Sequence, residues 1–175
     1  MSKNNPVVLI LMGVAGCGKT TVGKALAARL DCPFYDGDDF HPPENLAKMA
    51  NGIPLEDVDR LPWLTCLHDL IHDHLVQGEA AVFACSALKK RYRDLLRSDN
   101  RGAIIIYLQG ERDLIQKRLQ SRQGHFMKTG MLESQFEALE APSPDEAILV
   151  DITGSVEGII QQILAHVPGS SKGRS

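Results

Sequence analysis

One run of eight residues carries the strongest chemical signal in the sequence. It reads Gly13-Val14-Ala15-Gly16-Cys17-Gly18-Lys19-Thr20, fits the pattern G-x-x-x-x-G-K-S/T, and is followed directly by Thr21. Glycines at these positions let the backbone curl so that successive amide hydrogens point at phosphate oxygens, and a helix that begins near the lysine adds the positive end of its dipole. The run therefore predicts a phosphate-binding loop for a nucleoside triphosphate.

Two side chains of this loop have predicted roles of their own. Lys19 would reach the β and γ phosphates of ATP, and the hydroxyl of Thr20 would coordinate Mg2+. A supporting carboxylate is also needed, but the apolar run at 80–85 ends without an aspartate. The run Tyr35-Asp36-Gly37-Asp38-Asp39 is the better source.

On an extended segment, two acids at a spacing of two point the same way, as Asp36 and Asp38 would here. One could hold a metal-bound water, while the other orients an acceptor hydroxyl and accepts its proton. The alternative is an acidic turn that caps a helix, because Asp and Gly are common in turns.

Arg118 and Arg122 form a second candidate pair, because their i, i+4 spacing puts both guanidinium groups on one helix face. An arginine carried in by a closing lid can neutralise the charge that builds on a transferred phosphoryl group. The alternative is an exposed basic face. We expect the lid at residues 122–139.

The elements that must position these residues alternate along the chain. Strands are expected at 7–12, 33–35, 80–85, 103–108 and 147–152, and helices at 19–30, 88–97, 111–122 and 156–166. Continuous apolar runs are typical of strands buried on both faces of a parallel sheet. The alternation predicts an α/β fold with a parallel sheet.

Length and composition favour a single domain over residues 1–175, with a frayed tail at 168–175. The formal net charge of −3 argues against a nucleic-acid partner. The apolar stretch at 7–12 is too short for a signal peptide or a membrane span, and the four cysteines form no CxxC pair. We therefore expect a cytoplasmic protein with no membrane contact.

Longer motifs resemble a known family. They are Asp36-Gly37-Asp38-Asp39-Phe40-His41-Pro42-Pro43-Glu44-Asn45, Gly52-Ile53-Pro54-Leu55, Asp59-Arg60-Leu61-Pro62-Trp63-Leu64, Cys85 through Arg97, and Gly124-His125-Phe126-Met127. With the phosphate loop they look like the bacterial gluconokinases, which belong to the shikimate-kinase and nucleoside-monophosphate-kinase group of P-loop folds. The resemblance runs from Val7 to about His166.

The resemblance implies transfer of phosphate from ATP to D-gluconate with Mg2+, giving 6-phosphogluconate. It also implies a three-layer fold with a central five-stranded parallel sheet, a substrate-binding region at about 36–76, and a homodimer. By the same analogy, Asp36 supports the metal, Asp38 faces the sugar hydroxyl, Arg60 holds the substrate carboxylate, Arg118 lies near the adenine, and Arg122 is the lid arginine. His41 and His125 are expected among the residues around the substrate.

Basic residues give the substrate class partial physical support. Arg60, Lys89, Lys90 and Arg91 can form a positive pocket for a carboxylate, which arginine can bind through two hydrogen bonds. Two alternatives stay open: a kinase for another small anionic metabolite, such as a shikimate-like acid or a nucleotide, and a regulatory P-loop NTPase. Cys17 is either a reactive thiolate near a helix terminus or a small buried side chain.

Overall fold

The computed structural model describes residues 7–121 and 130–168. Its five strands lie in the spatial order β2 (Phe34–Asp36), β3 (Ala81–Ala84), β1 (Val8–Met12), β4 (Ala103–Gln109) and β5 (Ala147–Asp151). Every neighbouring pair is parallel. The predicted α/β fold with a five-stranded parallel sheet is confirmed.

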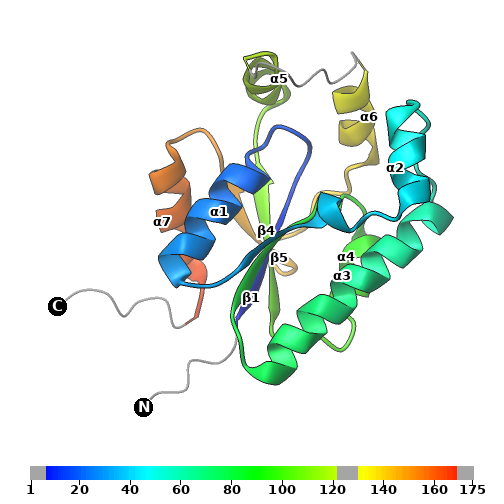
Figure 1. Ribbon diagram of the computed structural model, residues 1–175. Helices are drawn as coiled ribbons and strands as arrows, with labels where there is room; N and C mark the ends of the chain where they lie inside the picture. The colour runs from blue at the N-terminus through cyan, green and yellow to red at the C-terminus, as the bar shows by residue number, and fades with distance from the viewer. Residues whose placement is uncertain (1–6, 122–129, 169–175) are drawn as a thin grey trace.

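β1 is the central strand, and all five of its residues are buried. Leu9 and Leu11 belong to the core cluster that includes side chains of α1 (Lys19–Leu30) and α7 (Val156–His166). Val8, Ile10 and Met12 face the other cluster, with α3 (Asp57–Gln77) and α4 (Lys90–Arg97). Figure 1 shows these two pairs of helices on opposite faces of the sheet, which makes three layers.

The carboxyl edge of the sheet carries the remaining elements. A 3-10 helix (Gly37–Phe40) follows β2 and leads into α2 (Pro43–Ala50), while α5 (Arg112–Gln120) follows β4 and α6 (Met131–Ala138) comes later in the chain. Figure 1 places α2, α5 and α6 around this edge. In open parallel sheets, ligands bind at this edge where the strand order reverses, which here is at β1.

The expected helices and strands are present, with small shifts at several ends. Two predicted helix starts are wrong: the helix expected from residue 88 begins at Lys90, and the one expected from 111 begins at Arg112. The segment 36–76, expected to be the substrate-binding region, holds α2 and nearly all of α3, whose 21 residues include Pro62. Its buried stripe includes Trp63, Leu67 and Ile71, whose spacing of about four residues keeps the helix against the sheet despite the proline. Within the described residues, no helix is both long and apolar enough to cross a membrane.

Arg93 of α4 holds the connection between β3 and α4. Its side chain is 1% exposed and ion-paired to Glu146, with Nε 2.6 Å from Oε1. The guanidinium also donates to the carbonyls of Ala87, Leu88 and Glu140. All five N–H groups are therefore satisfied when the second contact to Glu146 is included. This network fixes the loop from which Lys89 extends.

We predict that Arg93→Leu lowers the free energy of unfolding by about 3–5 kcal/mol, because it leaves a buried carboxylate and several carbonyls without their partner. Urea unfolding followed by the fluorescence of the single tryptophan measures this. Adding Glu146→Leu should recover part of the loss, and Arg101→Leu on the exposed surface is the control. A loss no larger than that of the control would contradict the structural role of Arg93.

Candidate active site

The phosphate loop lies between β1 and α1, as the motif predicted. Gly16 and Gly18 have φ values of 82° and 102°, in the left-handed region that glycine tolerates. The ammonium group of Lys19 lies over the loop, 2.9 Å from the carbonyl oxygen of Gly13 and 3.1 Å from that of Val14. This curled backbone with a cation across it, at a helix N-terminus, fits a bound polyphosphate.

Thr20 and Asp36 come together although sixteen residues separate them. The Thr20 hydroxyl donates to Oδ2 of Asp36 at 3.3 Å. Two hard oxygen donors suit Mg2+, which binds through few protein ligands and completes its shell with water and substrate phosphates. No cluster of three or more His, Cys, Asp or Glu side chains suited to a metal occurs in the described part of the chain. The pair fits a magnesium ion shared with ATP.

The geometry around Asp38 corrects one expectation. Asp36 ends β2, whereas Asp38 lies on the 3-10 helix, so the two do not share an extended segment. Asp36 caps this helix by accepting the backbone N–H of Asp38 at 3.0 Å. The capping interpretation is therefore confirmed for Asp36, whose other carboxylate oxygen faces Thr20, whereas the metal and acceptor roles of the two acids stay predictions.

Asp38 keeps contact with solvent, but protein atoms crowd its carboxyl group. This partial desolvation raises the pKa of Asp38 above its ordinary value, and the charge of Asp36 raises it further. Lys19 and His41 act in the opposite direction. A carboxylate whose proton affinity is raised in this way is suited to accept a proton from a hydroxyl.

The predicted basic pocket assembles around the ring of Tyr92. Arg60 of α3 lies 5.6 Å from the ring centroid, Lys89 lies 5.9 Å away, and Arg91 lies 5.5 Å away. Arg91 is also ion-paired with Asp57, and the Tyr92 hydroxyl donates to the same carboxylate. Lys90, which was expected in this pocket, does not contribute to it.

The ammonium group of Lys90 instead binds Asp94 on the exposed face of α4. Arg60 and Lys89 have no ion-pair partner among the described residues. These two cations are therefore the ones best placed to receive an anionic group.

The other predicted site residues have mixed outcomes. Cys17 is fully buried in the core, which favours packing over reactivity. Thr21 is exposed in the first turn of α1. The Arg118 guanidinium donates to the Ile152 carbonyl at 2.7 Å, beyond the end of β5. Arg122, His125 and the rest of segment 122–129 of the expected lid lie outside the described residues, whereas α6 lies in the remaining part, 130–139.

Sequence reasoning missed Gln135 of α6. Its side-chain oxygen accepts the backbone N–H of Ala15 at 2.7 Å, so it occupies an amide of the phosphate loop across 120 residues of sequence. The sequence alone does not indicate this pair, because neither the separation of the two residues along the chain nor their residue types are distinctive. Bound phosphate would compete with Gln135 for this amide.

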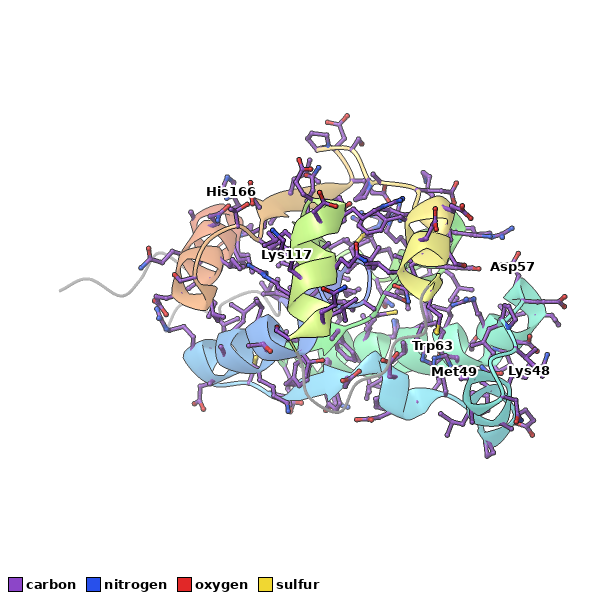
Figure 2. All side chains as sticks on the ribbon, turned by 90° about the horizontal axis from the view of Figure 1, so that it is seen from above. Lys48, Met49, Asp57, Trp63, Lys117 and His166 are labelled. Carbon is purple, nitrogen blue, oxygen red and sulfur yellow. The ribbon has the colours of Figure 1, made fainter. Side chains whose placement is uncertain are left out.

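The expected substrate-binding region at 36–76 contains α2 and nearly all of α3. His41 stacks on Trp63 with 4.1 Å between ring centroids, and Nε1 of Trp63 donates to the Gly37 carbonyl at 2.7 Å. Figure 2 looks down on the carboxyl edge and shows Trp63, Asp57, Lys48 and Met49 together on one side of the molecule. Lys117 and His166 lie on the opposite side. The side formed by α2 and α3 is thus separate from the α5 and α7 side.

The parallel sheet, the phosphate loop and the Thr20–Asp36 pair define a P-loop phosphotransferase. A family model described as shikimate kinase matches residues 15–167. The chain is 46% identical over 155 residues to the thermosensitive gluconokinase of Escherichia coli, covering 87% of this chain and 83% of that protein. It is 44% identical over 177 residues to a probable gluconokinase of Mus musculus, covering 91% and 96%.

A solved gluconokinase structure from Sinorhizobium meliloti superposes with a TM-score of 0.82 at 40% identity, covering 92% of this chain and 91% of that chain. The chain therefore belongs to the shikimate kinase family and, within it, to the gluconokinases. The fold, the kinase class and the use of ATP follow from this membership.

We predict that Asp38→Asn raises the free energy of unfolding modestly at neutral pH. Because the pKa of Asp38 is raised in the folded state, ionising it disfavours folding as the pH rises above the ordinary value of 3.8. The gain should therefore shrink as the pH falls toward 3.8, and solvent contact keeps it small.

Urea unfolding at a series of pH values, without nucleotide or metal, measures this gain. Asp73→Asn, on the exposed face of α3, is the matched control. An Asp38→Asn protein no more stable than wild type at neutral pH would show that Asp38 is not electrostatically disfavoured.

Proposed function

We propose that this chain transfers the γ-phosphoryl group of ATP to a hydroxyl of D-gluconate, giving ADP and 6-phospho-D-gluconate. The observation that carries the proposal is the meeting of Lys19, Thr20, Asp36 and Asp38 at one edge of the sheet in a member of the gluconokinases. Partial burial and the charge of Asp36 raise the pKa of Asp38, which suits its carboxylate to accept a proton from an acceptor hydroxyl.

The phosphate loop binds the nucleotide in this proposal. Backbone amides of the loop donate to the phosphate oxygens; the residues are Gly13, Val14, Ala15, Gly16, Cys17, Gly18, Lys19, Thr20 and Thr21. Lys19 leaves the carbonyls that it now contacts and binds the β and γ phosphates. Gln135 yields the Ala15 amide. Arg118 borders the adenine, since it is anchored beside the end of β5.

Thr20 would hold Mg2+ directly and Asp36 would hold it through water, and the bound ion would supply positive charge that neutralises the phosphates. Asp38 orients the acceptor hydroxyl in line with the γ-phosphorus atom. The new P–O bond forms as the bond to the leaving β-phosphate oxygen breaks, and the hydroxyl proton passes to Asp38. The predicted roles of Arg122 in charge neutralisation and of His125 at the substrate stay predictions.

Arg60 and Lys89 bind the carboxylate of gluconate, with Arg91 contributing less because Asp57 already neutralises part of its charge. Burial lowers the pKa of His41, and the charge of Arg60 is close enough to lower it further. The acceptor thus lies between the Tyr92 cluster and the Asp38 turn.

Two further properties belong to the proposal. We place the protein in the cytoplasm, because its four cysteines are free thiols, as a reducing compartment favours. We also propose a homodimer. Five exposed large apolar side chains on α2, on the segment that follows it and at the start of α3 support it: Leu46, Met49, Ile53, Val58 and Leu61. Sedimentation of the wild-type protein tests the dimer.

A coupled ADP-release assay with MgATP tests the function against gluconate, shikimate, glycerate, glucose and AMP, with a control lacking acceptor. Turnover with gluconate alone is the expected result. Turnover with a different acceptor would keep the kinase and reject gluconate, and ADP release independent of any acceptor would instead favour a regulatory NTPase.

We predict that Arg60→Ala raises the gluconate KM by roughly ten- to a hundredfold, because a hydrogen bond to a charged group contributes about 1.5–3 kcal/mol. The KM for ATP should change little. Arg91→Ala should have a smaller effect, and Arg29→Ala, on the exposed surface of α1, is the control. An unchanged gluconate KM in Arg60→Ala would remove Arg60 from the carboxylate site.

A further inference from the structure

Asn45 of α2 is a polar side chain with only 2% exposure, in the acceptor half of the site. Its amide nitrogen Nδ2 lies 2.9 Å from the backbone carbonyl oxygen of Asp59 and 3.2 Å from Nδ1 of His41. A buried amide with two partners of this kind has little freedom to rotate. The contacts of Asn45 therefore determine how His41 is presented.

The hydrogen bonds of Asn45 fix the tautomer of His41. A backbone carbonyl can only accept, so the atom of Asn45 facing Asp59 is the nitrogen and not the amide oxygen. That nitrogen has two hydrogens, and the second one points at Nδ1 of His41. Nδ1 must then accept, and the proton of the neutral ring lies on Nε2.

The ring is neutral for an independent reason. Burial lowers the pKa of His41, and the charge of Arg60 lowers it further, whereas Asp38 opposes both effects. A neutral ring with an unprotonated Nδ1 has one N–H group left to donate, at Nε2.

The orientation of the ring is also fixed. Trp63 stacks on it at an interplanar angle of 20°. The backbone N–H of His41 contacts the Asp38 carbonyl at 3.5 Å, which links the ring to the turn that carries the proposed proton acceptor. Within the described residues, Nε2 has no hydrogen-bond partner.

The support behind Asn45 is rigid. Both carboxylate oxygens of Asp59 lie 2.9 Å from Nζ of Lys48, and one of them accepts the N–H of Glu56 at 2.9 Å. These contacts fasten α2 to the first turn of α3. The carbonyl that orients Asn45 is therefore held in place by both helices.

We propose that Asn45 is a positioning residue that holds His41 as an Nε2–H donor to a hydroxyl oxygen of the acceptor. The inference rests on the proposed function. An acceptor hydroxyl that donates its hydrogen to Asp38 can still accept a hydrogen bond from His41 through its lone pairs. The carboxylate of the substrate is better matched by the cations of Arg60 and Lys89. His41 and Asp38 would then select a polyol chain, and the Tyr92 cluster would select the acid group.

Asn45→Asp tests the proposal, because it keeps the size of the side chain but replaces the donor with an acceptor. The His41 proton should move to Nδ1, which leaves no uncharged donor at Nε2. We expect kcat/KM for gluconate to fall roughly tenfold or more, with the KM for ATP unchanged. Asn51→Asp makes the same change on an exposed side chain that contacts only the Ala47 carbonyl, and should behave as wild type.

A double-mutant cycle separates this role from a structural one. His41→Gln keeps an N–H donor near the position of Nε2 without depending on a tautomer. Asn45→Asp should therefore cost much less in the His41→Gln background than in the wild type. Equal costs in the two backgrounds would overturn the proposal.

Nitrogen NMR of the unliganded wild-type protein gives a test that needs no folded Asn45 variant. Of the six histidines, the His41 signals are those lost in His41→Gln. We expect Nε2 to be protonated and Nδ1 unprotonated at neutral pH, and the reverse would overturn the proposal. Failure of the wild type to phosphorylate gluconate would instead reject the proposed function, and with it the donation from His41 to the acceptor. The tautomer of His41 is tested separately, by the NMR measurement alone.

Discussion

The burial of β1 between β3 and β4 is the constraint on which the site depends. Parallel pairing on both sides leaves this strand no polar face, so its residues are apolar throughout. The chain must leave the sheet at the end of β1, and the phosphate loop forms at that exit. The same pairing brings β2 and β3 alongside, so that Asp36 reaches Thr20 at the start of α1.

Asp36 joins the two halves of this arrangement. One of its carboxylate oxygens accepts the Thr20 hydroxyl, and the other caps the 3-10 helix that carries Asp38. The side chain of Asp36 therefore links the turn that carries Asp38 to the start of α1 beside the phosphate loop. The cost is electrostatic, because partial burial and then the neighbouring charge of Asp36 raise the pKa of Asp38. The site thus gives up some stability for a group suited to accept a proton.

Local signals were sufficient for the central strand, the phosphate loop and most helix positions, because a buried apolar run and a glycine-rich motif are each contiguous in the sequence. The long helix α3 was not predicted from the sequence, because Pro62 interrupts the helical pattern. The helix continues through Pro62 because Trp63 and Leu67 pack in the core against the sheet. Spacing favoured two acids on an extended segment, whereas Asp38 lies on a 3-10 helix that Asp36 caps, as the alternative interpretation of an acidic capping turn predicted.

Contacts between distant segments could not be read from the chain. The hydrogen bond from the Ala15 amide to Gln135 depends on how α6 returns to the sheet edge. The basic cluster also differs from the prediction. Four cations were expected to form one pocket, but Lys90 pairs with Asp94, which lies four residues further along the same helix.

The proposed phosphoryl transfer depends most directly on the action of Asp38 on the acceptor hydroxyl. Steady-state turnover of Asp38→Asn with saturating gluconate and MgATP, measured beside the ATP dissociation constant, tests this role, with Asp39→Asn as the control. We expect kcat to fall roughly a hundred- to ten-thousandfold, as for removal of a positioned general base, while ATP binding stays close to wild type. Near-normal turnover in Asp38→Asn would contradict the account.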